Sequence, residues 1–191
     1  MKDAPAKAAE GKPYRAETMV LLILATTSFV FCGIGMDAAH FRFSTGHGGL
    51  THAKITMWDT ETCIGGNCTN VKHDADGVCK DLKNAMWGAA AFGVIGTVVL
   101  GCTVLVCLLD IFKVADTCVA AHGMSALAWI FLCLVWAIDC GVFNYELCDA
   151  PLNLKKLRWR YASGFGLFIA SWGLLTPTII SLVALITGKK K

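Results

Sequence analysis

The residues best suited to chemistry in this sequence are cysteines and histidines, and most of them fall between long apolar stretches. Cysteines at short spacing form disulfides in an oxidising compartment, whereas cysteine and histidine together can bind zinc. The spacings repeat no paired C-x-x-C or H-x-x-x-H pattern, so disulfides are favoured and no metal site or cofactor is predicted. The disulfide candidates are Cys63, Cys68, Cys79, Cys140 and Cys148.

The pairing of these cysteines stays open at this point, because connectivity cannot be deduced from spacing. Cys63 and Cys68 flank a glycine-rich turn and can form a bridge across it, but Cys79 competes for either partner. Cys140 and Cys148 can instead close the second loop on itself. Five is an odd number, so one cysteine stays unpaired, and Cys140 is the candidate because it lies at the edge of an apolar stretch.

Four histidines accompany the first group of cysteines: His40, His47, His52 and His73. We interpret them as solvated loop residues. The alternative is that they respond to acidic surroundings, since histidine changes its charge near pH 6.5.

Composition and hydrophobic length indicate a membrane protein. Charged residues make up 16% and hydrophobic residues 55% of the chain, whereas a soluble domain carries about 25% charged residues. A helix that crosses a bilayer needs roughly 20 mostly apolar residues. Four stretches reach about this length without lysine or arginine, namely 19–36, 86–109, 118–138 and 162–187. They delimit an N-terminal tail (1–18), a first loop (37–85), a link (110–117), a second loop (139–161) and a C-terminal tail (188–191).

The sidedness of the four spans rests mainly on the cysteines, because lysine and arginine nearly balance across the membrane. Disulfides persist outside the cytosol, which predicts that both loops face outward. The sequon at Asn67, formed with Cys68 and Thr69, has meaning only on that side, although a disulfide at Cys68 would restrict access to it. We therefore expect a plasma-membrane protein with both termini in the cytosol, or alternatively a protein of an organellar membrane.

The first loop contains a β-hairpin signal. Apolar and polar residues alternate along 41–44 and again along 51–58, on either side of a glycine-rich turn. This pattern predicts two antiparallel strands. The expected fold is a membrane-embedded all-α four-helix bundle with a small disulfide-stapled β-sheet ectodomain, as in claudins.

Small residues recur inside the spans at spacings that allow close helix packing. Gly93 and Gly96 lie in the second span, and Ala162, Gly166 and Ala170 form a ridge in the fourth. Such faces stabilise the bundle, and they are equally consistent with self-association or contacts with other membrane proteins.

Ionisable residues are rare in the spans. Asp139 lies at the outer end of the third span and His122 near its other end. An ionisable residue at such depth is a functional candidate by default. Neither lies at the midplane, however, and no span carries the series of acids that a proton or ion pathway needs.

Two stretches resemble the amastins, four-span surface proteins of trypanosomatid parasites that are related in architecture to claudins. The run 161–172 is similar to the opening of the amastin fourth helix. Residues 55–58, followed by Cys63, are similar to the first-loop signature of the family. The chain departs from that signature at Lys54, where the family has cysteine, and at Asp59, where it has glycine.

The resemblance implies a surface membrane protein without catalysis. It also implies that Trp58, Cys63 and Cys68 stabilise an ectodomain sheet on the bundle.

Three functions remain open from the sequence, and none is enzymatic, since no hydrolase elbow, phosphate loop or metal-binding helix motif occurs. The first is membrane organisation, adhesion or host and cell contact. The second is a structural accessory subunit of a larger, possibly organellar, membrane complex. The third is a component of a transporter or channel, for which midplane polar residues and an inverted repeat are lacking. Lipid and other membrane proteins are the expected partners, and the absence of a basic patch excludes nucleic acid.

Overall fold

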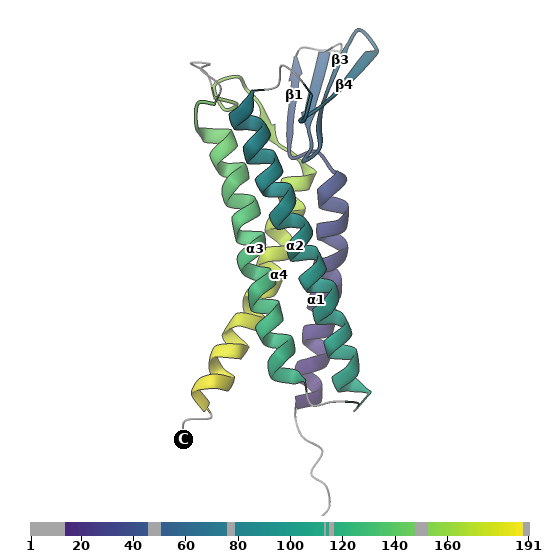
Figure 1. Cartoon of the computed structure of the whole chain (residues 1–191), viewed down its shortest axis with the longest axis vertical. Coiled ribbons are helices and arrows are strands. Elements are labelled where there is room, and N and C mark those ends of the chain that lie inside the picture. The colour runs from purple at the N-terminus through teal and green to yellow at the C-terminus, as the bar shows by residue number, and fades with distance from the viewer. Residues whose placement is uncertain are drawn as a thin grey trace, which may run out of the picture.

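Four long helices make up most of the protein (Figure 1). The computed structural model describes residues 14–45, 51–75, 79–112, 114, 117–147 and 153–188. Within this part of the chain, four helices are long and apolar enough to cross a membrane. They are α1 (Tyr14–Asp37), α2 (Lys80–Ile111), α3 (Cys118–Asn144) and α4 (Ser163–Gly188).

The helices form a four-cornered bundle. Extensive contacts join α1 to α2, α2 to α3, α3 to α4 and α4 to α1, whereas α1 and α3 lie diagonally and touch little. Small residues such as Ala25, Ala89 and Ala128 are fully buried beside Leu132 and Phe168. Small side chains let the backbones approach closely, which is how helices associate in lipid, where hydrophobicity supplies no driving force between them.

An antiparallel five-stranded sheet stands at one end of the bundle, which we call the sheet end (Figure 1). Its strand order is β4-β3-β2-β1-β5. The predicted hairpin is confirmed, with Phe41 opposite Ile55 and Thr45 opposite Thr51. The strands are β1 (Phe41–Thr45), β2 (Thr51–Ile55), β3 (Asp59–Ile64), β4 (Asn67–Lys72) and β5 (Arg160–Tyr161).

The sheet is continuous with the bundle because both share buried side chains. Phe41 and Ile55, from paired positions of β1 and β2, form a cluster with Met86 of α2 and Val142 of α3. The short strand β5 pairs with β1 and leads directly into α4. The sheet is therefore fixed at its base to three of the four helices.

Two helices run further toward the sheet than their apolar stretches predict. The third helix continues to Asn144 instead of ending at 138, so Asp139 and Cys140 lie in a helix rather than in the second loop. The second helix begins at Lys80 rather than at 86. Hydropathy marks the part of a helix that faces lipid, whereas these extra turns are stabilised by packing under the sheet through Leu82 and Val142.

The fourth helix runs through Pro177, and its last part leans away from the other helices in Figure 1. Thr176 donates a hydrogen bond to the Trp172 carbonyl (3.2 Å), and Thr178 donates to the Leu175 carbonyl (2.7 Å). These bonds supply donors to carbonyls of the turn that proline interrupts.

Candidate functional site

A disulfide closes the β3–β4 hairpin at its tip. Cys63 and Cys68 are direct cross-strand partners and are bonded to each other. Gly65 (φ +59°) and Gly66 (φ +88°) form the turn between them, in the left-handed region that glycine adopts readily. Asn67 is the first residue of β4 and is exposed.

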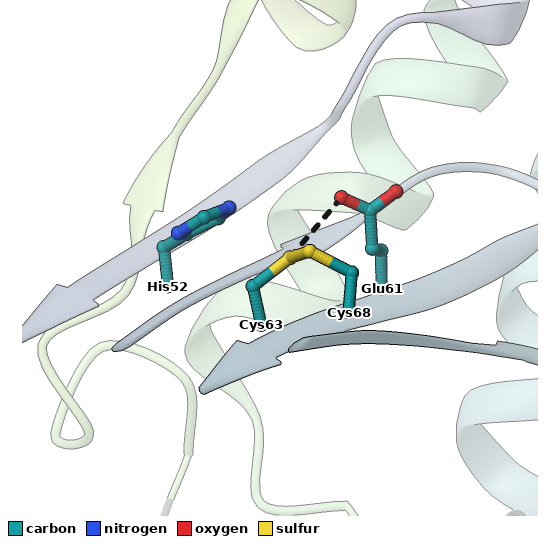
Figure 2. Close-up of side chains that lie close together, drawn as sticks. All are labelled: His52, Glu61, Cys63 and Cys68. Atoms are coloured by element: carbon teal, nitrogen blue, oxygen red, sulfur yellow. Dashed lines mark hydrogen bonds between the residues drawn. A yellow bond between two sulfur atoms is a disulfide. The ribbon is translucent and has the colours of Figure 1, made fainter. Parts of the chain in front are cut away.

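His52 and Glu61 lie beside this disulfide (Figure 2). Ligand atoms of these two residues and the two sulfurs all lie within 4.8 Å of one another. Zinc is bound by thiolates, and two sulfurs bonded to each other offer none. The dashed line in Figure 2 joins Glu61 Oε1 and Cys63 Sγ (3.5 Å), which is a contact because a disulfide sulfur has no proton to donate. Glu61 is instead paired with Lys54 at 2.9 Å.

The remaining disulfide candidates have different environments. Cys79, which directly precedes α2, is also disulfide-bonded. Cys140 is a free thiol on α3, and the hydroxyl of Tyr161 lies 3.8 Å from its sulfur. Burial, together with Cys140 and Asp139 nearby, raises the pKa of Tyr161 above its usual range. Cys148 lies outside the described residues.

The turn between β2 and β3 is organised by Thr56 and Asp59. The Thr56 hydroxyl donates to Asp59 Oδ1 (2.7 Å) and accepts from the Asp59 backbone N–H (3.0 Å). Asn70 of β4 donates to the other carboxylate oxygen of Asp59 at 2.8 Å. His73 is buried against the same turn, with its Nε2 3.0 Å from the Thr56 carbonyl.

The pH dependence of this turn follows from Asp59. Burial alone would raise the pKa of the carboxyl, but hydrogen bonds from Thr56 and Asn70 and the charges of His73 and Lys54 lower it overall. The pKa of this carboxyl is lower in the folded protein than in the unfolded chain, where it is about 3.9. The ionised carboxylate therefore stabilises the fold above about pH 3.9, and this stabilisation is lost as pH falls through the pKa of the folded state.

We therefore predict that Asp59→Asn destabilises the protein at pH 7. The loss should be no more than about 1 kcal/mol, because the carboxyl is largely solvated. The difference from the unsubstituted protein should shrink as pH falls from about 4 through the lowered pKa of Asp59, where the carboxyl becomes protonated. Thermal unfolding of both proteins in detergent between pH 3 and 7 measures it. A difference that is constant over this range would contradict the assignment.

The most deeply buried polar contact of the sheet end joins His40 and Asp139. His40 Nδ1 lies 2.7 Å from Asp139 Oδ2, and His40 Nε2 lies 3.2 Å from the Gly35 carbonyl. Both side chains are fully buried. The ring of His40 also packs on Phe168, with 5.6 Å between ring centroids. The interaction joins the segment between α1 and β1 to α3, 99 residues away.

This pair is neutral as a whole whichever way its protons are arranged. The Gly35 carbonyl can only accept, so His40 Nε2 must carry a hydrogen. Nδ1 then either donates to an ionised Asp139 or accepts from a protonated one, and the net charge of the pair is zero in both cases. No described residue donates to Asp139 Oδ1. Because the pair is neutral as a whole, no isolated charge is buried at the junction of sheet and bundle.

Glycine at position 164 allows the start of α4 to approach this pair. A Cβ atom there would lie 2.7 Å from the Ala38 carbonyl oxygen and 2.8 Å from His40 Cδ2. The backbone N–H of Gly164 donates to the Ala39 carbonyl at 2.8 Å. The close approach therefore needs glycine, and it ties α4 to the α1–β1 connection.

The interpretation of the histidines as solvated loop residues is wrong for two of the three that the structure describes. His40 and His73 are buried, whereas His52 is exposed, and the three do not form one cluster. The reason is that each buried ring finds polar partners on another segment. His47 lies outside the described residues.

The family of this chain follows from its match to a family model. A family model described as amastin surface glycoprotein matches residues 24–185, which is most of the chain. The chain belongs to the amastin family. No curated protein sequence matches it. The four apolar helices and the family agree on a membrane protein.

In this amastin, the tryptophan of the first-loop signature lies in the β2–β3 turn and is partly exposed. The Trp58 side chain is 45% exposed, whereas its neighbour Met57 is buried and belongs to the core of the bundle. Met57 lies close to Gly93 of α2, where a Cβ would be 3.5 Å from Met57 Cε, an ordinary van der Waals contact. The stabilising role that the resemblance implies for Trp58 stays a prediction, and Met57 is the residue of this turn that enters the core of the bundle.

The predicted helix-packing residues of this amastin divide into two groups. Gly93 and Gly96 face neighbouring helices, and a Cβ at Gly96 would lie 3.3 Å from Leu132. Gly166 is exposed with nothing within 4 Å, so it makes no close helix contact with the part of the chain that the structure describes, and a packing role for its ridge with Ala162 and Ala170 stays a prediction. The spacing of small residues predicts that they share one face of a helix, but it does not predict what that face contacts.

Sequence reasoning missed the partnership of His40 with Asp139. Asp139 was a functional candidate by itself, because an acid at that depth needs a partner. Nothing local in the sequence selects His40, because the connection depends on how the sheet sits on the bundle. Gly164 was missed for the same reason.

Proposed function

We propose that this amastin is a non-enzymatic plasma-membrane protein that contributes to adhesion or membrane organisation through its exposed β3–β4 hairpin. In this proposal both loops lie outside the cell and both termini lie in the cytosol. The disulfide between Cys63 and Cys68 supports this orientation, because disulfides persist in oxidising surroundings.

The observation that carries the proposal is the open edge of the sheet. All six residues of β4 are exposed, and β4 is the last strand in the sheet order. No described segment pairs with its outer side. An edge strand offers unpaired N–H and C=O groups to a strand of another chain. Two large apolar side chains, Ile64 (63% exposed) and Val71 (45% exposed), belong to the same hairpin.

The base of the hairpin is fixed, which suits a contact surface. Met57 anchors the β2–β3 turn in the bundle, and the disulfide closes the far end. A surface that is already ordered loses little conformational entropy on binding. We propose self-association of copies in two facing membranes as the contact that this hairpin makes.

Asn67 belongs to the proposal as a glycosylation site, in keeping with a family of surface glycoproteins. It is exposed at the start of β4, beside the disulfide at Cys68. A glycan there would restrict strand pairing at this end of the edge. Treatment with an endoglycosidase should increase the electrophoretic mobility of the unsubstituted protein and leave that of Asn67→Gln unchanged.

The proposal is tested with full-length protein in vesicles, with clustering measured by light scattering. We expect the vesicles to cluster, and we expect Val71→Asp to reduce clustering severalfold, because a charge in the contact must be desolvated. Leu157→Asp is the matched control, since Leu157 is an exposed apolar residue (42%) of the second loop.

Two results would count against the proposal. Vesicles that stay separate show that the hairpin makes no self-contact, and equal clustering of both variants shows that the contact lies elsewhere. If the native protein migrates with other chains on a native gel from cell membranes, the accessory-subunit function is favoured instead.

A further inference from the structure

A cavity of about 550 Å³ lies between the β2–β3 turn, the adjoining ends of β3 and β4, and the outward face of α2. Its upper wall belongs to the sheet and includes Trp58 and Lys72. Its lower wall is α2, from Trp87 to Ile95. Trp87 is 58% exposed and Ile95 is 43% exposed, so the cavity opens away from the core of the bundle. Figure 1 shows the strands of the hairpin at the sheet end, where α2 begins.

The position of this cavity along α2 places it at a membrane boundary. The helix has 32 residues, or about 48 Å at 1.5 Å per residue, whereas the hydrocarbon core is about 30 Å thick. The apolar stretch of the helix begins at Met86. Trp87 therefore lies at the level of lipid headgroups, where tryptophan is enriched, and Val94 and Ile95 lie about two turns further into the acyl region.

The walls of the cavity change from charged and aromatic at the sheet end to apolar further along α2. Lys72, Asp59 and Asp74 line it together with the two tryptophans at the sheet side. Below them the wall is formed by Ala90, Ala91, Val94 and Ile95. One end thus offers a cation, two carboxylates and two aromatic rings, while the other end is purely apolar.

A positive and a negative side chain of the cavity wall are both available to a ligand. Lys72 and Asp74 are exposed, and neither forms an ion pair with another residue of the described part of the chain. Asp59 is held by Thr56 and Asn70 and contributes its negative charge from a fixed position. The low pKa of Asp59 keeps it ionised at neutral pH.

We propose that this cavity binds the headgroup and upper acyl chain of a zwitterionic phospholipid from the leaflet at the sheet end. Lys72 forms an ion pair with the phosphate. The carboxylates of Asp59 and Asp74 both attract the ammonium group. Trp58 and Trp87 contact that cation through their ring faces, as aromatic rings do with quaternary ammonium ligands. Val94 and Ile95 contact the acyl chain. The volume is within the range of roughly 300–1,000 Å³ for small-molecule sites, which is sufficient for the headgroup and the first methylene groups.

This site is separate from the contact proposed for the outer edge of β4, because it lies between the sheet and the bundle. Bound lipid would hold the sheet at a fixed height over the leaflet.

Photo-crosslinking of the full chain in lipid nanodiscs tests the proposal. One probe is a diazirine-bearing phosphatidylcholine, and the other is the matching phosphatidylglycerol, which has the phosphate but no ammonium group. We expect adducts on the peptide covering residues 87–95, with at least about threefold more from phosphatidylcholine. Asp74→Asn and Trp87→Leu should each lower this preference, and both side chains are exposed, so folding is not at risk.

The control is Glu146→Gln, which removes an exposed ion pair with Lys156 (2.7 Å) in the second loop and should leave the preference unchanged. Equal labelling by both probes would overturn the proposal, as would labelling spread evenly over the lipid-facing helices. A crosslink between two protein chains at this cavity would show that a second copy occupies it instead, which would also overturn the proposal.

Discussion

Replacing Asp139 by alanine should lower the free energy of unfolding by about 3–5 kcal/mol, because His40 would be left buried without its partner. The two side chains are fully buried and 2.7 Å apart, and no solvent can replace the lost contact. We expect the effect in detergent or bicelles, where unfolding is followed by circular dichroism.

The double variant His40→Leu with Asp139→Val should recover much of this loss, since apolar residues of similar shape can replace a buried polar pair. Asp37→Ala is the control, because Asp37 is exposed at the same end of the bundle. If Asp139→Ala were no more destabilising than Asp37→Ala, the pair would not fasten the sheet to the bundle.

Gly164→Ala should also be strongly destabilising, by about 1–3 kcal/mol or more. The new Cβ would lie 2.7 Å from the Ala38 carbonyl oxygen, and backbone cannot move aside as a flexible side chain can. The start of α4 would have to shift away from His40. The fraction of folded protein retained after heating in detergent measures this effect.

Gly166→Ala is the matched control, two residues further along the same helix. A Cβ there meets nothing within 4 Å, and alanine is the better helix former by about 1 kcal/mol. We therefore expect Gly166→Ala to be neutral or slightly stabilising. Equal losses for both variants would show that any substitution near the start of α4 is harmful and that the close approach has no special role.

The predictable parts of this protein are those that depend on local pattern. Hydrophobic length finds the spans, because a lipid environment imposes about 20 apolar residues on each helix. Alternation finds the β1–β2 hairpin, because one face of the strands is buried: Phe41 and Ile55 point inward while Arg42 is exposed.

The parts that cannot be predicted depend on how the sheet meets the bundle. The last turns of α3 contain Asp139 and Cys140 and look like loop by hydropathy, yet packing beneath the sheet keeps them helical. His40 looks like a solvated residue because its partner is 99 positions away. The entry of Met57 into the core of the bundle depends on how the β2–β3 turn sits on the helices, and the sequence pattern contains no information on that.

These contacts make the ectodomain and the spans a single unit. His40 joins α1 and β1 to α3, Gly164 brings α4 to the same point, and Met57 inserts the β2–β3 turn into the bundle. The hairpin of β3 and β4 is thereby held at a fixed orientation relative to the membrane. A fixed orientation supports the surface contact that we propose and the lipid site beneath it.

The central claim is that this sheet is displayed on the outside of the cell. Labelling of intact cells with a membrane-impermeant amine reagent, followed by peptide mass spectrometry, tests it most directly. We predict labelling of Lys72 on the sheet and of Lys155 and Lys156 in the second loop, which are all exposed. The C-terminal lysines 189–191 should be labelled only after permeabilisation. Labelling of the C-terminal lysines in intact cells, with Lys72 protected, would contradict the account.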